Sequence, residues 1–446
     1  MIRPLPHHRF GLALIGLLLF LALPLPGAPP APAASGAVPA RIILTWSGDP
    51  ATTQSVTWQT QSALATPQGQ VVKMSPHPDF EASAHTVPGR VTTEANAGTG
   101  TATHYAVEFS GLDPETKYQY RVGDGTVWSE WNVFRTAANK PQPFRFIYVG
   151  DAQNSIKSMW SRTIRAAFAT APDARFIASA GDLVAEGWDD RLWGEWCEAQ
   201  GFITAMIPSV PAPGNHDEHR PPGLPDSKKV LTVAPPWRAY FALPQNGPEA
   251  PELKSAAYFI DYQGLRFVVV DANVFANEDF VASEKERVWK AQVAWLERTL
   301  SNNPNHWTIV MQHQPIYAMA HGREYTEMRE ALAPLYEKYG VDLVLQGHDH
   351  HYSRTHKISR DRIGDPAQPG VIYAISVSGP KMYEVDQLHR PLQARVLMKT
   401  QCFQIVAVSP TALQYTAYSV DGAVVDSFEL TKSGKVSTYV NHAPAE

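Results

Sequence analysis

Five hydrophobic runs in this chain each lead into a short segment that contains residues typical of metal ligands. Glycine stands directly before the ligand in four of these segments. Buried strands that end in polar side chains are typical of open α/β folds, whose functional residues gather outside the carboxyl ends of the strands. The segments are Gly150-Asp151-Ala152-Gln153, Gly181-Asp182-Leu183-Val184, Gly214-Asn215-His216-Asp217, Gln312-His313 and Gly347-His348-Asp349-His350.

The runs before these segments alternate with stretches of helical periodicity. Apolar residues recur at helical spacing within 160–168, 288–296 and 328–336. We predict strands at 144–149, 176–180, 307–311 and 341–345, and a hairpin within 257–270. Strands that alternate with helices predict α/β layers. Residues 143–432, including the β-prone segments after Arg390, are therefore predicted to form one α/β domain, and residues 433–446 a polar tail.

Residues 38–138 show a different, all-β pattern. Short runs at 42–46, 55–59, 104–109 and 117–122 are rich in β-prone residues and are separated by turn-forming segments such as Gly111-Leu112-Asp113-Pro114. Many short strands with frequent turns predict a β-sandwich. Together with Trp58, the sequence Tyr118-Gln119-Tyr120-Arg121-Val122 resembles a fibronectin type III domain. The Pro-containing segment 138–143 is predicted to be a linker.

The first 35 residues have the pattern of a secretory signal followed by a Pro/Ala-rich segment. Arg3 and Arg9 form a basic start, and residues 10–23 are an apolar stretch of about 14 residues. We expect cleavage near Ala31-Pro32-Ala33, a secreted or periplasmic location, and no stable membrane span after cleavage. An uncleaved membrane anchor is the alternative, although the stretch is shorter than the ~20 residues that span a bilayer.

Overall charge and cysteine content set further bounds. The formal net charge of -5 and the pI of about 6.3 argue against a nucleic-acid-binding surface, which needs concentrated Lys and Arg. Cys197 and Cys402 are the two cysteines. In an oxidising compartment they could pair, and buried free thiols are equally compatible with the sequence.

The ligand types predict a site for two transition metals. Carboxylates combined with imidazoles suit Zn, Mn or Fe better than Mg or Ca alone. Two metals about 3.5–4 Å apart can act on the attacking and leaving oxygens of a phosphate ester. One carboxylate commonly bridges such a pair, and Asp182 is the candidate.

From about residue 144 to 380 the chain resembles the calcineurin-like metallophosphoesterases. With a β-sandwich in front, it is similar to the purple acid phosphatase branch in its bacterial secreted form. The five segments carry this resemblance, together with residues 240–248 and 347–354. The resemblance implies a four-layer α/β/β/α sandwich. It also implies that the first metal is held by Asp151, Asp182 and His350, and the second by Asp182, Asn215, His313 and His348.

The resemblance further implies roles around the substrate. His216 would contact the phosphate or protonate the leaving group, and Asp217 would orient His216 through a hydrogen bond. His321 matches a second histidine that faces the substrate. Arg323 is an additional candidate for pairing with phosphate. Asp349 is interpreted as a turn or surface residue.

Two positions depart from the family pattern. Purple acid phosphatases place a tyrosine three residues after the bridging Asp, where its phenolate binds ferric iron and gives the colour; this chain has Ala185. Many other family members carry His two residues after the first Asp, where this chain has Gln153. Its amide could be a weak ligand or could hold a metal-bound water. We therefore predict no purple colour, and a divalent pair rather than obligatory Fe(III).

These residues predict a phosphatase in which a metal-bound hydroxide attacks phosphorus directly, without a covalent phosphoenzyme. The expected substrate is a small phosphate monoester. A phosphodiesterase that acts on nucleotides or phospholipid head groups is the first alternative, because the same metal core serves both reactions. A non-catalytic surface-binding protein with a degenerate metal site is the second alternative, and Ala185 is its main support.

Overall fold

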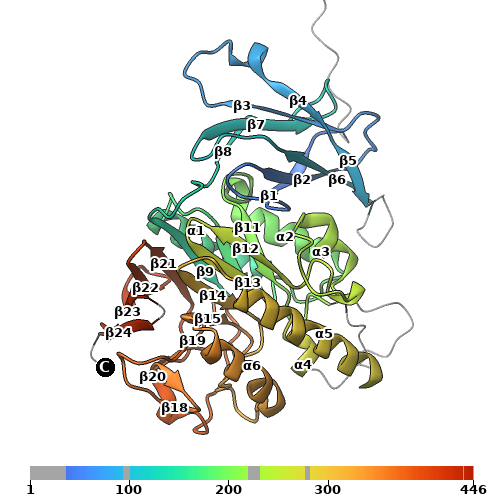
Figure 1. The fold of residues 1–446 in the computed structure, drawn as a ribbon. Helices are drawn as coiled ribbons and strands as arrows, with labels where there is room; N and C mark the ends of the chain where they lie inside the picture. Colours follow the sequence, from blue (N-terminus) through green and yellow to red (C-terminus); the bar gives the residue numbers. More distant parts are fainter. Residues whose placement is uncertain (1–36, 94–100, 219–231, 277–281, 435, 445–446) are drawn as a thin grey trace, which may run out of the picture. The chain divides into compact units, whose positions relative to one another are not determined.

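A computed structural model describes residues 37–93, 101–218, 232–276, 282–434 and 436–444, and Figure 1 shows the order of the elements along them. The predicted signal segment at 1–35 lies outside the described residues. Within the described ranges, no helix combines the length and the apolar character that crossing a membrane requires.

Two four-stranded antiparallel sheets form the N-terminal all-β region. Their strand orders are β1-β2-β6-β5 and β4-β3-β7-β8. Side chains that alternate along the strands pack between the sheets: Trp58 stacks on Tyr105 of the neighbouring strand at a centroid distance of 5.4 Å, and Tyr120 is fully buried. The strands are β1 (Ala40–Thr45), β2 (Gln54–Thr60), β3 (Gln68–Lys73), β4 (His85–Pro88), β5 (Arg90–Thr93), β6 (Thr103–Phe109), β7 (Lys117–Gly123) and β8 (Asn132–Arg135).

A seven-stranded sheet with the order β11-β10-β9-β21-β22-β23-β24 begins the α/β region. Its strands β9 (Phe144–Val149), β10 (Ile177–Ala180) and β11 (Ser209–Ala212) run parallel to one another. Helix α1 (Ser161–Thr170) packs on β9 and β21 and against α2 (Asp190–Gln200). The antiparallel strands are β21 (Cys402–Val408), β22 (Ala412–Ser419), β23 (Val424–Ser433) and β24 (Val436–Asn441).

A second seven-stranded sheet has the order β12-β13-β14-β15-β19-β16-β20. Its strands β13, β14, β15 and β19 are parallel, and β12 and β13 form the predicted hairpin. The strands are β12 (Tyr258–Tyr262), β13 (Leu265–Val269), β14 (Trp307–Met311), β15 (Leu343–Gln346), β16 (Tyr352–Thr355), β19 (Ile372–Ile375) and β20 (Gln393–Leu397), with a small ribbon of β17 (Ile358–Ser359) and β18 (Arg362–Ile363). The accompanying helices are α3 (Pro235–Tyr240), α4 (Asn273–Ala276), α5 (Ala282–Ser301) and α6 (Thr326–Lys338).

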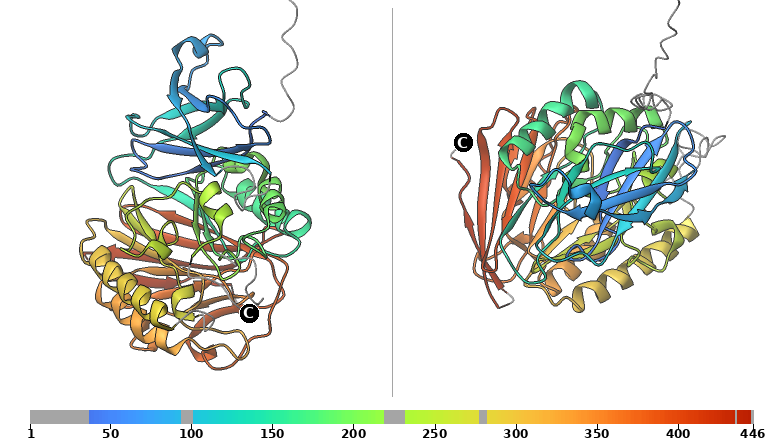
Figure 2. Two further views of the ribbon diagram at one scale, coloured as in Figure 1. Left: turned by 90° about the vertical axis from the view of Figure 1, so that its right-hand side faces the viewer. Right: turned by 90° about the horizontal axis from the view of Figure 1, so that it is seen from above.

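The two faces of the second sheet belong to different hydrophobic cores. Phe267 and Val269 pack in the core that is shared with the first sheet, whereas Val268 packs with residues of α5 and α6. Figure 2 shows α1 and α2 on one side of the paired sheets and α5 and α6 on the other. The strands therefore have apolar side chains on both faces, and the expected four-layer α/β/β/α architecture is confirmed.

Strand β24 corrects the prediction of a polar tail at 433–446. Val436–Asn441 pairs antiparallel with β23, and it buries Ser437 and Tyr439 while the alternate side chains face outward. The hydroxyl of Tyr439 also accepts a hydrogen bond from the buried Arg354 at 2.6 Å. A polar composition is compatible with an edge strand, because only one of its faces needs to be buried.

The pairing of the two cysteines, which the sequence left open, is settled by their positions. Cys197 lies in α2 and Cys402 in β21, and both are buried free thiols. Burial raises the pKa of each thiol to about 12. Neither is therefore a reactive thiolate at neutral pH.

Candidate metal centre

The predicted ligands follow neighbouring parallel strands in each of the two sheets. In the first sheet Asp151 follows β9, Asp182 follows β10 and Asn215 follows β11. In the second sheet His313 follows β14, and His348 and His350 follow β15. Because parallel neighbours end at the same edge of a sheet, the ligand segments gather at one edge of each sheet.

Hydrogen bonds join these two edges. The backbone N–H of His348 donates to Asp151 Oδ2 at 2.8 Å, although the two residues are 197 positions apart. The ring of His313 contacts the carbonyl of Ala180 at 2.7 Å. The hydroxyl of Tyr148 in β9 is hydrogen-bonded to the backbone of β15. The site therefore lies where the ligand-bearing edges of the two sheets meet.

Five of the predicted residues form two overlapping groups of possible metal ligands. The first ligand group is Asp151, Asp182 and His350, and the second ligand group is Asp182, His313 and His348. Within each group, one ligand atom per residue lies within 4.8 Å of the others, and all the side chains are buried. Asp182 belongs to both groups, which is the position expected of a carboxylate between two cations.

The tautomers of His313 and His350 follow from their hydrogen bonds. His313 Nδ1 lies 2.7 Å from the carbonyl of Ala180, and His350 Nδ1 lies 3.0 Å from the carbonyl of Lys381. A carbonyl only accepts, so each Nδ1 carries the proton. Each Nε2 then keeps the lone pair that a metal requires.

His348 presents its other ring nitrogen to the site. Its Nε2 lies 2.8 Å from the hydroxyl of Tyr325, and its Nδ1 lies 3.1 Å from His313 Nε2. The hydroxyl therefore holds the ring from the side opposite the second ligand group. Such a contact fixes the orientation of a ligating imidazole.

Burial and close charges shift the titration of this cluster. Burial raises the pKa of Asp151 to about 8, with a further contribution from the carboxylate of Asp182. Burial opposes charge on His313, but Asp182 Oδ2 lies 3.2 Å from Nε2 and raises the pKa of His313 to about 9. Burial lowers the pKa of His350 to about 3. Protons on Asp151 and His313 therefore compete with metals for the same ligand atoms.

The donor set fits a pair of transition metals. Among the described residues, Asp151 Oδ1 and Gln153 Oε1 are buried atoms without a hydrogen-bond partner. Buried polar atoms normally have a partner, and the open Asp151 Oδ1, which belongs to the first ligand group, is a feature that a cation would explain. Carboxylate oxygens with imidazole nitrogens suit Zn, Mn or Fe.

Four of the five clustered residues have left-handed backbone conformations. The φ angle is 52° at Asp151, 51° at Asp182, 73° at His348 and 49° at His350. For a residue with a Cβ atom this conformation costs on the order of 1–3 kcal/mol and persists only where the surroundings impose it. The strand ends thus turn sharply at the residues that carry the ligand atoms.

Glycines next to these residues make room for the ligands. A Cβ atom at Gly214 would overlap the carboxylate of Asp182. A Cβ at Gly181, where φ is 87°, would overlap the ring of His313. At Gly181 glycine also provides the positive φ of a tight turn, whereas at Gly214 it is the close approach of a ligand side chain that requires glycine.

His216 lies beside the shared carboxylate. Its backbone N–H donates to Asp182 Oδ1 at 2.9 Å. Its ring Nδ1 lies 2.6 Å from the carbonyl of Ala185, so Nδ1 donates there and Nε2 is the nitrogen that can give or take a proton. The backbone of Ala185 therefore has a role, although its side chain offers no donor.

The prediction that Asp217 orients the His216 ring is wrong. Asp217 instead accepts from the backbone N–H of Leu183 at 3.2 Å and of Gly214 at 2.9 Å. It ties the loop after β10 to the loop that carries Asn215. Burial raises the pKa of Asp217 to about 7. The chain order could not distinguish a carboxylate that holds loops from one that holds the adjacent ring.

His321 and Arg323 share a loop but differ in environment. The side chain of His321 is 83% exposed and its Nδ1 lies 3.5 Å from Asp386 Oδ2, so it belongs to neither ligand group. Arg323 is 25% exposed and donates to the carbonyl of His348 at 2.6 Å and to Asp349 Oδ1 at 3.0 Å. Arg323 therefore braces the loop after β15, whereas His321 lies at the surface.

Sequence reasoning missed three residues around this loop. Asp349 is fully buried rather than at the surface, and its Oδ2 accepts from the backbone of Met319 at 2.6 Å and Ala320 at 2.9 Å. The ring of Tyr383 lies 4.6 Å from that of His350, and Tyr325 contacts His348. Asp349 belongs to the segment Gly347-His348-Asp349-His350, so its position in the sequence could have indicated a role at the site. Tyr325 and Tyr383 lie outside all five ligand segments, so their positions carry no such indication.

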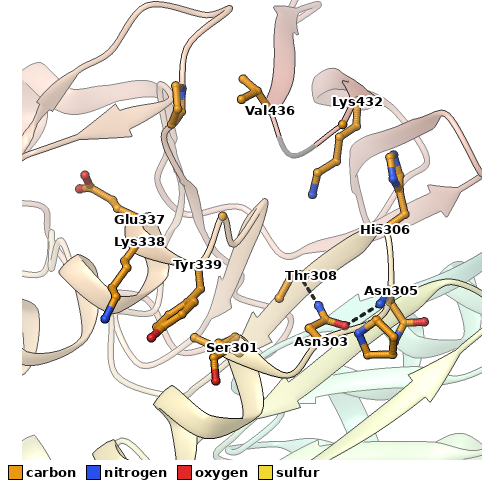
Figure 3. Close-up of a pocket in the computed structure, with 15 residues that line it drawn as sticks. Ser301, Asn303, Asn305, His306, Thr308, Glu337, Lys338, Tyr339, Lys432 and Val436 are labelled. Atoms are coloured by element: carbon orange, nitrogen blue, oxygen red, sulfur yellow. Dashed lines mark hydrogen bonds between the residues drawn. The ribbon is translucent and has the colours of Figure 1, made fainter.

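A cavity of about 500 Å³ lies away from the ligand groups. It is lined by residues at the ends of α5 and α6 and before β14, including Asn303, Asn305 and His306 (Figure 3). Lys432 in its wall pairs with the buried Asp342 at 2.7 Å. Because β14 begins here and ends before His313, the cavity and the ligand groups lie at opposite ends of one strand.

Two family models match the chain. The model of the purple acid phosphatase N-terminal domain matches residues 39–136, and that of the calcineurin-like phosphoesterases matches residues 144–352. An uncharacterized protein of Mycobacterium tuberculosis is 27% identical over 73% of this chain and 64% of its own length. Purple acid phosphatase 23 of Arabidopsis thaliana is 26% identical over 63% of each protein. The match thus spans less than two thirds of these relatives.

Solved structures show the same fold. A purple acid phosphatase from yellow lupin seeds superposes with a TM-score of 0.72 at 18% identity, covering 89% of this chain and 74% of its own. PhoD superposes with a TM-score of 0.68 at 13% identity, covering 93% of this chain and 94% of its own. With both domain models matched in the expected order, the chain belongs to the calcineurin-like phosphoesterases, in the branch that carries the purple acid phosphatase N-terminal domain.

Proposed function

We propose that this chain is a metal-dependent phosphatase that hydrolyses phosphate monoesters at a dinuclear centre. The observation that carries the proposal is the position of Asp182, whose carboxylate belongs to both ligand groups. One shared carboxylate would let the two groups hold two cations close enough together for both to act on one phosphate group. When bound, such a pair would supply positive charge to the phosphate oxygens and acidify water.

The proposed ligands extend the two groups by one residue. Asp151, Asp182 and His350 would hold the first metal, and Asp182, Asn215, His313 and His348 the second. Asn215 is included because it follows β11, next to the two strands that lead to Asp151 and Asp182. Zn, Mn or Fe(II) suits this donor set. Since Ala185 provides no phenolate, we expect a colourless enzyme.

Side chains of the loops would bind the ester and move its proton. His216 Nε2 is the nitrogen available to protonate the leaving oxygen, because Nδ1 is engaged with the Ala185 carbonyl. Arg323 uses Nη1 for the loop after β15, which leaves its Nε and Nη2 groups for phosphate oxygens. The exposed His321 is proposed as a second substrate contact at the entrance. Water is the nucleophile, so no covalent phosphoenzyme forms.

We also propose that the chain is exported. Arg3 and Arg9 followed by the apolar stretch at 10–23 support a signal peptide. N-terminal sequencing of the protein from the periplasm or medium of a producing bacterium tests this proposal. A new terminus near Ala33 is expected, and an intact Met1 on a cytoplasmic protein would contradict it.

The deciding experiment measures metal content and phosphate release together. Protein purified without chelator is measured by elemental mass spectrometry and assayed with an aryl phosphate monoester and a bis-aryl diester. We expect about two metals per chain and monoester turnover, both lost in Asp182→Ala. Asp173→Ala is the matched control, because Asp173 is an exposed partner of Arg145 outside both ligand groups.

The other outcomes separate the alternatives. Two metals with turnover of the diester alone would favour the phosphodiesterase. No metal and no turnover after addition of Zn, Mn and Fe would leave a non-catalytic binding protein.

A further inference from the structure

The amide of Gln153 lies inside the first ligand group. Gln153 follows Asp151 by two positions and is 1% exposed. Its Nε2 lies 2.8 Å from Asp182 Oδ2 and 3.1 Å from His350 Nε2. Its Oε1 is buried without a hydrogen-bond partner among the described residues. The amide nitrogen therefore has two hydrogen-bond partners, and the amide oxygen has none among the described residues.

The atoms that hold Nε2 are those that would hold a cation. His350 Nδ1 carries its proton toward the Lys381 carbonyl, so His350 Nε2 presents a lone pair. Asp182 Oδ2 is an acceptor as well. The partially positive NH₂ group of Gln153 thus satisfies two acceptors of the first ligand group. An amide nitrogen has no available lone pair, so in this orientation Gln153 cannot itself bind a metal.

Rotation of the terminal amide by about 180° exchanges Nε2 for Oε1 without moving the rest of the side chain, because the two atoms have nearly the same shape. The carbonyl oxygen would then face the position between Asp182 and His350. An amide oxygen is an acceptor with two lone pairs and is a known metal ligand.

We propose that Gln153 binds the first metal directly through Oε1 after this rotation, and that it replaces the donor missing at Ala185. The inference rests on the proposed dinuclear function. It also sets the charge of the first site: with a neutral amide in place of a phenolate, the anionic ligands are Asp151 and Asp182 alone. Asp182 is also shared with the second ligand group, so the first site carries little negative charge and favours a divalent metal over Fe(III).

Metal titration of three variants tests the inference. Gln153→Leu keeps a similar shape but removes both polar atoms, and Gln153→Glu keeps an oxygen. Gln54→Leu is the matched control, because Gln54 is a buried glutamine of the N-terminal sandwich whose side chain donates to the carbonyl of Thr45 at 2.8 Å. The readouts are two-site Zn affinities of the apo-protein and a crystal structure of the Zn-loaded protein.

We expect Gln153→Leu to weaken the first Zn site at least tenfold and the second site less, with Gln153→Glu binding at least as tightly as the natural protein. In the Zn-loaded structure, Oε1 should lie about 2.0–2.2 Å from the metal. Unchanged affinities in Gln153→Leu would overturn the inference, as would a loaded structure with Nε2 still on Asp182 or with water between the amide and the metal. Fewer than two metals in the natural protein would overturn the dinuclear proposal and this inference together.

Discussion

Replacing Tyr325 by Phe removes a single hydroxyl from the metal centre. That hydroxyl lies 2.8 Å from His348 Nε2, while His348 presents Nδ1 to the second ligand group. Loss of the group that orients a ligating imidazole typically lowers metal affinity 10–100-fold, which corresponds to about 1.4–2.8 kcal/mol. His348, the residue that Tyr325 contacts, belongs to the second ligand group and not to the first. The first metal should therefore lose less affinity than the second.

The assay is a competition titration of apo-protein with Zn against a fluorescent chelator, fitted to two sites. The thermal unfolding of the apo-variant should change by only about 1 kcal/mol, the contribution of one hydrogen bond. Tyr317→Phe serves as the control, because it removes a comparable hydroxyl that donates to Asp361 at 2.8 Å, outside both ligand groups. An equal loss at both sites, or none at either, would refute the assignment of Tyr325 to His348.

Three further predictions concern protonation, packing and the support of the sheets. Metal affinity should depend on pH: burial raises the pKa of Asp151 to about 8, and Asp182 raises that of His313 to about 9. Protons are therefore bound at neutral pH and must leave on metal binding, so the Zn affinity of each site should fall by up to about tenfold per pH unit from pH 8 to 6; a flat profile in titrations at three pH values would contradict this. Gly214→Ala should lower stability by about 1–3 kcal/mol and reduce metal content, because its Cβ would overlap the Asp182 carboxylate; scanning fluorimetry and elemental analysis measure both, and full metal content would count against the packing argument. Arg354→Met should cost about 3–5 kcal/mol in urea unfolding, because it leaves the fully buried Asp426 without its charged partner at 2.6 Å. The double variant with Asp426→Leu should recover most of that loss, and no recovery would show that the pair is not the cause.

The strands and the candidate ligands could be predicted because their signals are local. The strand predicted at 144–149 coincides with β9, and that at 307–311 with β14. An apolar run, a turn and a polar residue follow one another within a few positions. The hydrophobic pattern and the order of these residues are therefore enough to predict the strand and the ligand that follows it. The grouping implied by the family resemblance agrees with the two ligand groups for their five residues, while Asn215, the sixth implied ligand, is not among them.

The contacts that orient the ligands could not be predicted in the same way. The partner of His348 Nε2 is Tyr325, which comes from a different loop, and the partner of His216 Nδ1 is a backbone carbonyl. A carbonyl exists at every residue and leaves no mark in the sequence. Asp217 was assigned to the nearest ring in the chain, whereas in space it holds two backbone amides. The local sequence was enough to identify the candidate residues, but their hydrogen-bond partners are determined by tertiary packing.

The two ligand groups differ in how far they depend on position 185, where this chain has Ala185 instead of the tyrosine of purple acid phosphatases. The second ligand group needs nothing from position 185, because it consists of Asp182, His313 and His348. The first ligand group keeps both carboxylates and His350, and the left-handed backbone at Asp151 and His350 still presents them to one point. A site that had lost its function would have no reason to retain backbone strain on the order of 1–3 kcal/mol at four of the five clustered residues. Loss of the tyrosine therefore acts on one group alone, where it should change which metal is preferred rather than whether two are bound.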